Sequence, residues 1–244
     1  MARPRAATYD DQREQILARA AELFARQGYS ATTMNQVAAA CGVTKPTLYH
    51  YGADKQSLLL HIAGGHVARL EALCAEVRAD CLPPQEGLRA LIQRFMQAYA
   101  HAQHEHRVLT EDVRYLPDQQ RAQVLDAERR VVACFADAVA ALRPDLQAQA
   151  LHKPLTMLLF GMMNWTFTWL RADGELTYRA LGDMVADLFC GGLPQVAAVR
   201  SAPATAPSRP PPAAAPAAQR PRPGCPAPRP ARRRSVARSP RRRR

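Results

Sequence analysis

The sequence lacks the patterns that mark several classes of protein. Its six cysteines form no CxxC pair and have no metal-ligand spacing, which indicates reduced thiols in a cytoplasmic protein without a metal site. The N-terminus carries basic residues but no apolar stretch of the kind that a signal peptide needs. No Ser-His-Asp set, pair of carboxylates or glycine-rich phosphate loop stands out, so we expect neither an enzyme nor a bound cofactor.

Patterns that predict β-strands are also absent. No alternating β-branched run, hairpin signal or internal repeat occurs, whereas apolar residues recur at helical spacing along most of the chain. The most apolar run, residues 155–170, is shorter than the ~20 residues that a membrane span needs, and it contains polar residues such as Asn164. The sequence therefore predicts an all-α protein in which this run is a buried helix.

Positive charge is concentrated at the C-terminus. The formal net charge is +12, but 12 of the 33 Lys and Arg residues lie in residues 201–244, where no acidic residue occurs. The other 21 basic residues are balanced by 21 acidic ones. Residues 196–244, rich in Pro, Ala and Arg, are predicted to be a disordered tail because they have little apolar surface to bury. This tail is either a polycation that strengthens non-specific DNA binding or a solvated extension with little role.

Residues 33–55, TMNQVAAACGVTKPTLYHYGADK, have the pattern of two short helices joined by a glycine turn. Thr33 with Gln36 three residues later is a capping-box pattern, which marks the start of the first helix. Gly42 supplies the permissive backbone of the turn, and Thr44 is an N-cap for the second helix. The pattern predicts a helix-turn-helix.

The second helix of this motif, residues 45–51, is polar and aromatic on its surface. Leu48 is its only clearly apolar residue, and the other side chains offer hydroxyls, a cation, an imidazole and aromatic edges, the groups that contact phosphates and base edges in DNA. The first helix covers residues 34–41, and an amphipathic helix over residues 11–27 supports both. The alternative is a surface helix of an all-α protein that binds no DNA, because this geometry is not confined to DNA-binding proteins.

Residues 16–59, ILARAAELFARQGYSATTMNQVAAACGVTKPTLYHYGADKQSLL, resemble the N-terminal domain of the TetR family of bacterial transcription regulators. The resemblance implies a recognition helix over residues 45–51 and a homodimer that reads two half-sites about one DNA turn apart, ~34 Å. It also implies DNA contacts from eight residues of the motif, namely Thr33, Thr44, Lys45, Thr47, Tyr49, His50, Tyr51 and Lys55. Gly52 departs from the family pattern, which usually has an aromatic residue there, and is expected to loosen the join to the next helix.

Asp54 is an N-cap for a long helix over residues 55–80, which in the family connects the DNA-binding head to the rest of the protein. Its predicted buried stripe consists of Leu58, Leu59, Ile62, His66, Leu70, Leu73 and Val77. Gly64 and Gly65 each cost roughly 1 kcal/mol against Ala in a helix, so either a neighbour approaches closely there or the helix bends. The chain is predicted to divide into a DNA-binding domain, the connecting helix, a ligand-binding and dimerisation domain, and the tail, over residues 1–54, 55–82, 83–195 and 196–244.

Five further helices are predicted, over residues 85–103, 105–115, 118–142, 154–171 and 176–190. In the family the last two pair with their copies to form a dimer. The run LFGMMNWTFTWL within them resembles the same region of members that respond to acyl-CoA thioesters or other lipid-like molecules. Asn164 would be a polar anchor in a pocket lined by Met157, Phe160, Met163, Asn164 and Phe167. The alternative is that these residues are core and dimer contacts, because methionine and aromatic stripes usually pack.

Two other clusters are weaker candidates. The most metal-like one consists of His101, His104, Glu105 and His106, but His106 points away from the face that the other histidines share, so an exposed polar turn is the better prediction. Cys74 and Cys81 lie about 10 Å apart on one helix, too far for a disulfide, so a redox sensor would need another cysteine.

Together these patterns predict a dimeric transcriptional regulator that binds a palindromic DNA operator. Repression is the commoner behaviour in the family, and release would follow binding of a small apolar or acyl-CoA-like effector. The alternative is a basic DNA-associating protein in which the cationic tail dominates and no effector exists.

Overall fold

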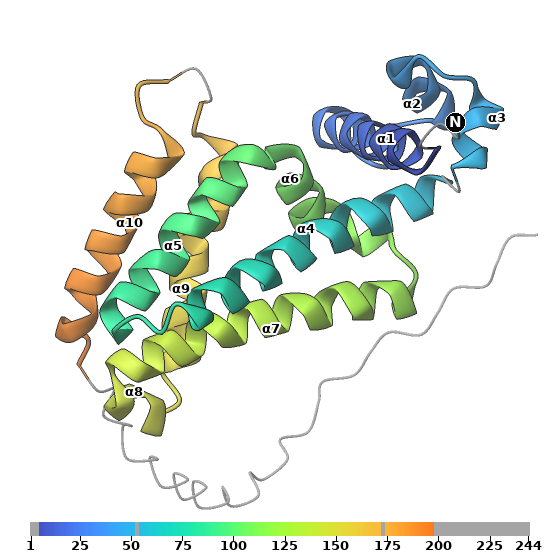
Figure 1. Ribbon diagram of the computed structural model, residues 1–244. Helices are drawn as coiled ribbons and strands as arrows, with labels where there is room; N and C mark the ends of the chain where they lie inside the picture. Colours follow the sequence, from blue (N-terminus) through green and yellow to red (C-terminus); the bar gives the residue numbers. More distant parts are fainter. Residues whose placement is uncertain (1–4, 52–53, 172–173, 198–244) are drawn as a thin grey trace, which may run out of the picture. The chain divides into compact units, whose positions relative to one another are not determined.

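The computed structural model describes residues 5–51, 54–171 and 174–197, and all regular structure in these ranges is helical, as predicted (Figure 1). The elements are α1 (Arg5–Gln27), α2 (Met34–Cys41), α3 (Lys45–His50), α4 (Lys55–Ala79), α5 (Pro84–His101), α6 (Gln103–Asp112), η1 (Val113–Tyr115), α7 (Asp118–Leu142), α8 (Pro144–Ala148), α9 (His152–Asn164), η2 (Trp165–Thr168), α10 (Tyr178–Gly192) and η3 (Leu193–Gln195). We call α1 to α3 the head and α5 to α10 the body. Beyond residue 197, the predicted tail lies outside the described residues.

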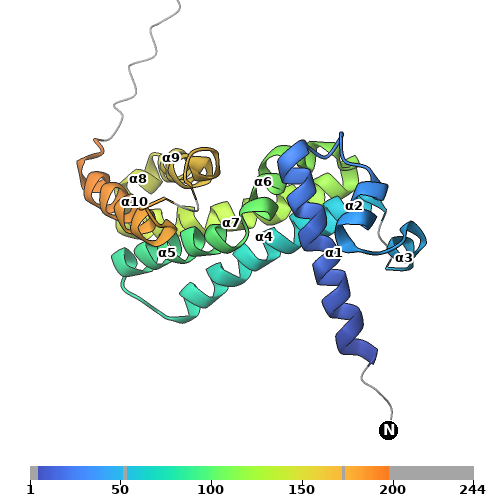
Figure 2. The ribbon, with the colours of Figure 1, turned by 90° about the horizontal axis from the view of Figure 1, so that it is seen from above.

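The head is held by α1, which contacts α2, α4 and α6 (Figure 2). Its buried face includes Ile16, Ala20 and Phe24. The helix begins at Arg5, earlier than the predicted start at residue 11. The sequence did not predict this first part of the helix because no apolar periodicity precedes residue 11. The segment instead contacts a distant residue: the ring of Tyr9 stacks on that of Tyr51, with ring centroids 4.7 Å apart.

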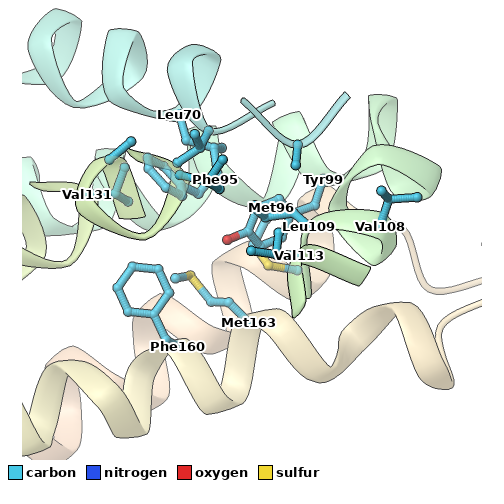
Figure 3. Close-up of a cluster of buried hydrophobic side chains, with 14 of the residues drawn as sticks. Leu70, Phe95, Met96, Tyr99, Val108, Leu109, Val113, Val131, Phe160 and Met163 are labelled. Carbon is cyan, nitrogen blue, oxygen red and sulfur yellow. The ribbon is translucent and has the colours of Figure 1, made fainter. Parts of the chain in front are cut away.

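The centre of the fold is the long parallel pair α4 and α7, which lie side by side (Figure 1). Buried aromatic residues extend this core to α5 and α9: the Phe135 ring lies 4.8 Å from that of Phe95 and 4.9 Å from that of Phe160. Figure 3 shows Phe160 and Met163 projecting from α9 into this cluster. Because α4 packs against α7, the helix that follows the head is also part of the core of the body.

The buried face of α4 differs from the prediction at one position. Leu73 is only half-buried, whereas Cys74 is 5% exposed. Leu70, Cys74 and Val77 continue the stripe at helical spacing toward α7, so the prediction of Leu73 as a buried residue was wrong.

Gly64 and Gly65 lie within α4 without interrupting it. A Cβ atom at Gly64 would have no neighbour within 4 Å, and one at Gly65 would meet only the Arg69 side chain at 3.9 Å. Close approach of a neighbour is therefore not the reason for these glycines, and a bend that differs between ligand states stays a prediction.

The last two helices differ from their predicted limits. The α-helix of α9 ends at Asn164 rather than residue 171, and the 3-10 turn η2 follows. Thr166 and Thr168 donate hydroxyl hydrogen bonds of 2.7 Å to the backbone carbonyls three residues before them, and such bonds compete with the α-helical pattern. Helix α10 begins at Tyr178, later than predicted, because Thr177 caps it by accepting a 3.1 Å bond from the Ala180 amide.

Of the described helices, only α4 is long and apolar enough to cross a membrane. It packs against α1, α5, α6 and α7, which is the position of a core helix. The run at residues 155–170 does not form one long helix, because α9 ends within it.

Candidate functional site

The helix-turn-helix has the local geometry that its sequence predicts. The Thr33 hydroxyl accepts a 3.3 Å hydrogen bond from the Gln36 amide, and the Gln36 side chain accepts a 2.7 Å bond from the Thr33 amide, so the capping box is confirmed. Gly42 has φ +66°, the left-handed conformation that favours glycine. Thr44 caps α3 by accepting a 3.3 Å bond from the Thr47 amide. These contacts fix the angle at which α3 leaves the turn.

Helix α3 is anchored by one side and exposed on the other. Leu48 is fully buried beneath it, whereas Lys45, Tyr49 and His50 are exposed. Half of the Tyr49 surface is accessible although it is a large aromatic residue. Thr47 is half-buried, and its hydroxyl bonds that of Thr44 at 2.8 Å. A cation, a phenol and an imidazole therefore project together from one short helix.

Two of the predicted DNA contacts are engaged inside the protein. Helix α3 ends at His50, one residue before the predicted end, and the half-buried Tyr51 stacks on Tyr9. The Lys55 ammonium donates a 3.2 Å bond to the Ser30 carbonyl and lies 4.4 Å from the centroid of the Tyr29 ring. The predicted residues that remain exposed are Thr33, Thr44, Lys45, Tyr49 and His50. Gly52 lies outside the described residues.

The body contains a cavity of about 580 Å³ between α4, α5, α6, α7 and α9. Of the predicted pocket residues, Met157, Phe160 and Asn164 line it. Met163 is fully buried in the core instead, and Phe167 packs against the ring of His106 at 6.0 Å. The other apolar lining residues come mainly from α4, α6 and α7 and include Val67, Leu70, Leu109, Leu125, Val131 and Val132.

Besides Asn164 and His106, the cavity is lined by charged groups at positions that the sequence did not single out. Lys153 and Arg129 are exposed, and Arg129 is paired with Asp126. Glu128 also lines the cavity, and burial raises the pKa of its carboxyl group. Its position on the apolar stripe of α7, one turn after Val124, was the signal that could have identified it. The cavity thus combines apolar walls with basic residues, which suits an amphipathic ligand.

A pair of buried histidines lies beside the cavity, and one of them, His106, lines it. The Nε2 atom of His66 on α4 lies 3.3 Å from Nδ1 of His106 on α6, and the two residues are 1% and 3% exposed. The second ring nitrogen of each makes no hydrogen bond. Tyr99 stacks on His106 at 3.8 Å and donates a 2.9 Å bond to the Asn164 side chain. Burial lowers the pKa of His66 to about 3 and that of His106 to about 4, so both rings are neutral at physiological pH.

His106 and His66 face different hollows. His106 lines the 580 Å³ cavity, whereas His66 lines a second hollow of about 610 Å³ between α1, α4 and the end of α5. The prediction that His106 points away from its neighbours in sequence is confirmed, because His101 and His104 are exposed. The described residues contain no group of three or more His, Cys, Asp or Glu that is arranged to hold a metal ion.

Large apolar side chains are exposed on the last helices of the body, from α9 to α10. Leu158 and Trp165 are each 65% exposed, and Leu188 is 66% exposed. The exposed apolar set of α9, η2, the residue that follows η2, and α10 consists of Met157, Leu158, Met162, Trp165, Trp169, Met184 and Leu188. Large exposed apolar surfaces of this kind mark interaction sites in soluble proteins.

Comparison with known proteins covers both the head and the body. The family described as "Bacterial regulatory proteins, tetR family" matches residues 16–62, and the one described as "Tetracyclin repressor-like, C-terminal domain" matches residues 81–193. The HTH-type transcriptional activator FasR of Mycolicibacterium smegmatis is 26% identical over 192 residues, which are 79% of this chain and 87% of FasR.

Solved structures agree with this comparison. A TetR-family transcriptional regulator from Bordetella parapertussis is 36% identical, with a TM-score of 0.71 over 76% of this chain and 97% of that one. AibR, solved in complex with isovaleryl coenzyme A and operator DNA, is 26% identical, with a TM-score of 0.63 over 72% of this chain and 97% of AibR.

Proposed function

The chain belongs to the TetR family of bacterial regulatory proteins, and from that premise we propose that it is a ligand-responsive transcriptional regulator. In this proposal a homodimer binds a palindromic DNA operator in the cytoplasm, and a small apolar or acyl-CoA-like effector releases it. The single observation that carries the proposal is the path of α4, which begins at the capped helix-turn-helix and forms part of the wall of the 580 Å³ cavity.

The exposed side of α3 supports the DNA-binding part. Lys45 is suited to a phosphate, whereas Tyr49 and His50 offer hydrogen-bonding and aromatic edges to bases. The part of the chain outside the basic tail is formally neutral, so a few directed contacts must supply the specificity. Lys55 and Tyr51 would contact DNA only by giving up their present partners, and we assign them a supporting role.

The exposed apolar residues of α9, η2 and α10 support the homodimer. Covering them with a second copy would remove large side chains such as Trp165 and Leu188 from water. A two-fold dimer would also present two copies of α3 to half-sites about one helical turn apart, as operator symmetry requires.

The cavity supports an amphipathic effector. Its apolar walls suit an acyl chain, and Lys153 and Arg129 are placed for an anionic head group. AibR, which has isovaleryl coenzyme A bound in its structure, provides a chemical precedent among similar proteins. The similarity of the body to a repressor family favours repression, although FasR is named an activator.

Release would be a shift between two arrangements of the same dimer. An effector lowers operator affinity only to the extent that it binds the arrangement with incompatible head spacing more tightly than the compatible one. Helix α4 would connect the DNA-binding site with the effector site, because it contacts α1 of the head and lines the cavity. Both DNA and the effector would therefore act on the balance between the two arrangements through this helix.

A footprint tests the DNA-binding proposal. Operators would be selected from a random duplex library with the full-length protein, and protection would be mapped on the selected sequence. We expect two protected half-sites, lost in Tyr49→Ala and kept in Gln119→Ala, a matched change at an exposed position of α7. Uniform coating of the DNA, or a normal footprint with Tyr49→Ala, would favour the alternative in which the basic tail dominates.

The effector is tested separately on the same operator. Isovaleryl coenzyme A, free coenzyme A and isovalerate would be added to the preformed complex, and native mass spectrometry would detect any molecule that co-purifies with the protein. Release by the thioester alone supports an acyl-CoA-like effector. A stable footprint with no release and no co-purifying apolar molecule would contradict the effector while leaving the DNA-binding function in place.

A further inference from the structure

Two buried thiols from different helices meet in the body. Cys74 on α4 is 5% exposed and Cys134 on α7 is 8% exposed. Both cysteines are free thiols, and both line one cavity. The packing of α4 against α7 brings them together, since they are far apart in sequence. Cys74 therefore has a thiol partner that its own helix does not supply.

The surroundings give the two thiols different chemistry. Arg78, one helical turn after Cys74, lines this cavity together with both thiols. The interaction with Cys74, helped by the positive charge of Arg78, lowers the pKa of the Cys134 thiol in spite of burial. The pKa of Cys74 is raised, chiefly by its interaction with Cys134 and by burial. Of the two thiols, Cys134 is thus the one that loses its proton more readily.

A small molecule has a route to this pair. Cys74, Arg78 and Cys134 line a cavity of about 270 Å³ together with Cys81 and Leu82, which are exposed. This cavity shares no lining residue with the 580 Å³ cavity. Its volume exceeds the roughly 30 Å³ that one water molecule occupies in the liquid, so a molecule of the size of hydrogen peroxide fits.

We propose that Cys74 and Cys134 form a peroxide-sensitive thiol pair that closes to a disulfide between α4 and α7. The Cys134 thiolate attacks one peroxide oxygen, the O–O bond breaks, and hydroxide leaves, which gives a sulfenic acid at Cys134. The Cys74 sulfur then attacks the Cys134 sulfur, the S–O bond breaks, and the hydroxyl leaves as water with the Cys74 proton. The two thiols together lose two electrons, and the peroxide accepts them.

The location of the pair gives this oxidation a mechanical consequence. A covalent bond at Cys74 would join the C-terminal part of α4 to α7 and restrict any movement of α4 relative to the body. An effect on operator binding rests on the proposed function, because it needs α4 to connect the head with the cavity. The disulfide chemistry itself does not depend on that function.

Peptide mapping of the full-length protein tests the chemistry. The reduced protein would be treated with hydrogen peroxide, its remaining thiols alkylated, and the digest analysed by mass spectrometry without reductant. We expect tryptic residues 70–78 linked to residues 131–171, because proline follows both Arg143 and Lys153; the linked product is two hydrogens lighter than the free peptides and is separated by dithiothreitol. Wild-type protein in which Cys81 is oxidised while Cys74 and Cys134 remain open to alkylation after unfolding would overturn the proposal.

Variants separate the two roles, with circular dichroism confirming that each remains folded. Cys74→Ser should accumulate a Cys134 sulfenic acid that dimedone traps, whereas Cys134→Ser should give neither the adduct nor the link. The matched control Cys81→Ser should form the link as the wild type does. Equal dimedone labelling at Cys74 and Cys134 in the two single variants would contradict the assignment of the roles.

Operator binding is measured last, on oxidised and reduced wild-type protein. A change in affinity of about five-fold or more, absent in Cys74→Ser, is expected if α4 couples the two sites. A link that forms without changing affinity would refute the regulatory consequence and leave the thiol chemistry standing. Failure of the reduced protein to bind any operator would refute the proposed function instead.

Discussion

The buried histidine pair makes the stability of this protein depend on pH in a defined window. Because burial lowers the pKa of His66 and His106, the folded protein keeps both rings neutral until the pH falls to about 4 and then 3. The unfolded chain takes up protons at these residues near pH 6.5. The stability is therefore intact above pH 6.5 and is lost progressively as the pH falls below it.

The size of the loss follows from these values. At pH 5, about 1.5 pH units below the ordinary pKa of histidine, protonation of each histidine stabilises the unfolded chain by about 2 kcal/mol, at 1.36 kcal/mol per unit. The folded protein takes up almost no protons at these residues over the same range, so it gains almost no stabilisation. The pair should cost about 4 kcal/mol of folding free energy at pH 5. That is a large share of the roughly 5–15 kcal/mol that stabilises a typical domain. Arg69, whose charge further disfavours protonation of His66, acts in the same direction.

Urea unfolding of the wild type and of His66→Leu/His106→Phe at pH 7 and pH 5 measures this loss. Phenylalanine keeps the ring that stacks on Tyr99, and all other histidines are present in both proteins, so their titration cancels. The wild type should lose about 4 kcal/mol more than the double variant between the two pH values. His104→Gln, an exposed change on α6, should behave as the wild type does.

Parallel stability curves for the wild type and the double variant from pH 7 to pH 5 would refute this reasoning. Such a result would mean that water or a rearranged neighbour satisfies the charged rings. A much smaller loss in His104→Gln than in the wild type would assign the pH dependence to the surface of α6 instead.

Three further predictions concern local packing, capping and charge. Gly182→Ala should destabilise the fold by about 1–3 kcal/mol in thermal unfolding, because the added Cβ lies 3.2 Å from the Met96 Cβ; an unchanged midpoint would contradict this contact. Thr33→Ala removes the hydroxyl that caps α2 and should cost about 0.5–2 kcal/mol, whereas Asn35→Ala, exposed in the same helix, should cost less in the same urea titration. Deleting residues 201–244 should leave operator preference intact and flatten the salt dependence of DNA binding measured by fluorescence anisotropy, and an unchanged slope would count against the polycation hypothesis.

Local patterns were the part of the fold that the sequence predicted well. Caps at Thr33, Thr44 and Asp54 and the left-handed turn at Gly42 depend on residues at most three positions apart, and all are confirmed. Helix α7 also matches its predicted limits, because its apolar spacing is regular and prolines stand close to both ends. The end of α9 was wrong because threonine hydroxyls there bond to the backbone, which periodicity does not reveal.

Contacts between distant segments were not predictable from one sequence. His66 was placed correctly on the buried face of α4, but its partner His106 lies 40 positions later and belonged to a cluster interpreted as an exposed turn. Lys55 was assigned to DNA from the family pattern, yet its ammonium lies over Tyr29. In each case the side chain's role depends on a neighbour that only the packing of helices supplies.

The two threonine caps have a consequence for how this protein changes its target sequence during evolution. Thr33 and Thr44 each hold the start of a helix, so substitutions there alter the folding of the motif as well as any contact with DNA. The side chains of Lys45, Tyr49 and His50 cap neither helix of the motif. Under the DNA contacts that we propose, adaptation to a new operator can therefore draw on very few positions without a loss of stability. Paralogues with different targets should then vary at these three residues and keep both caps.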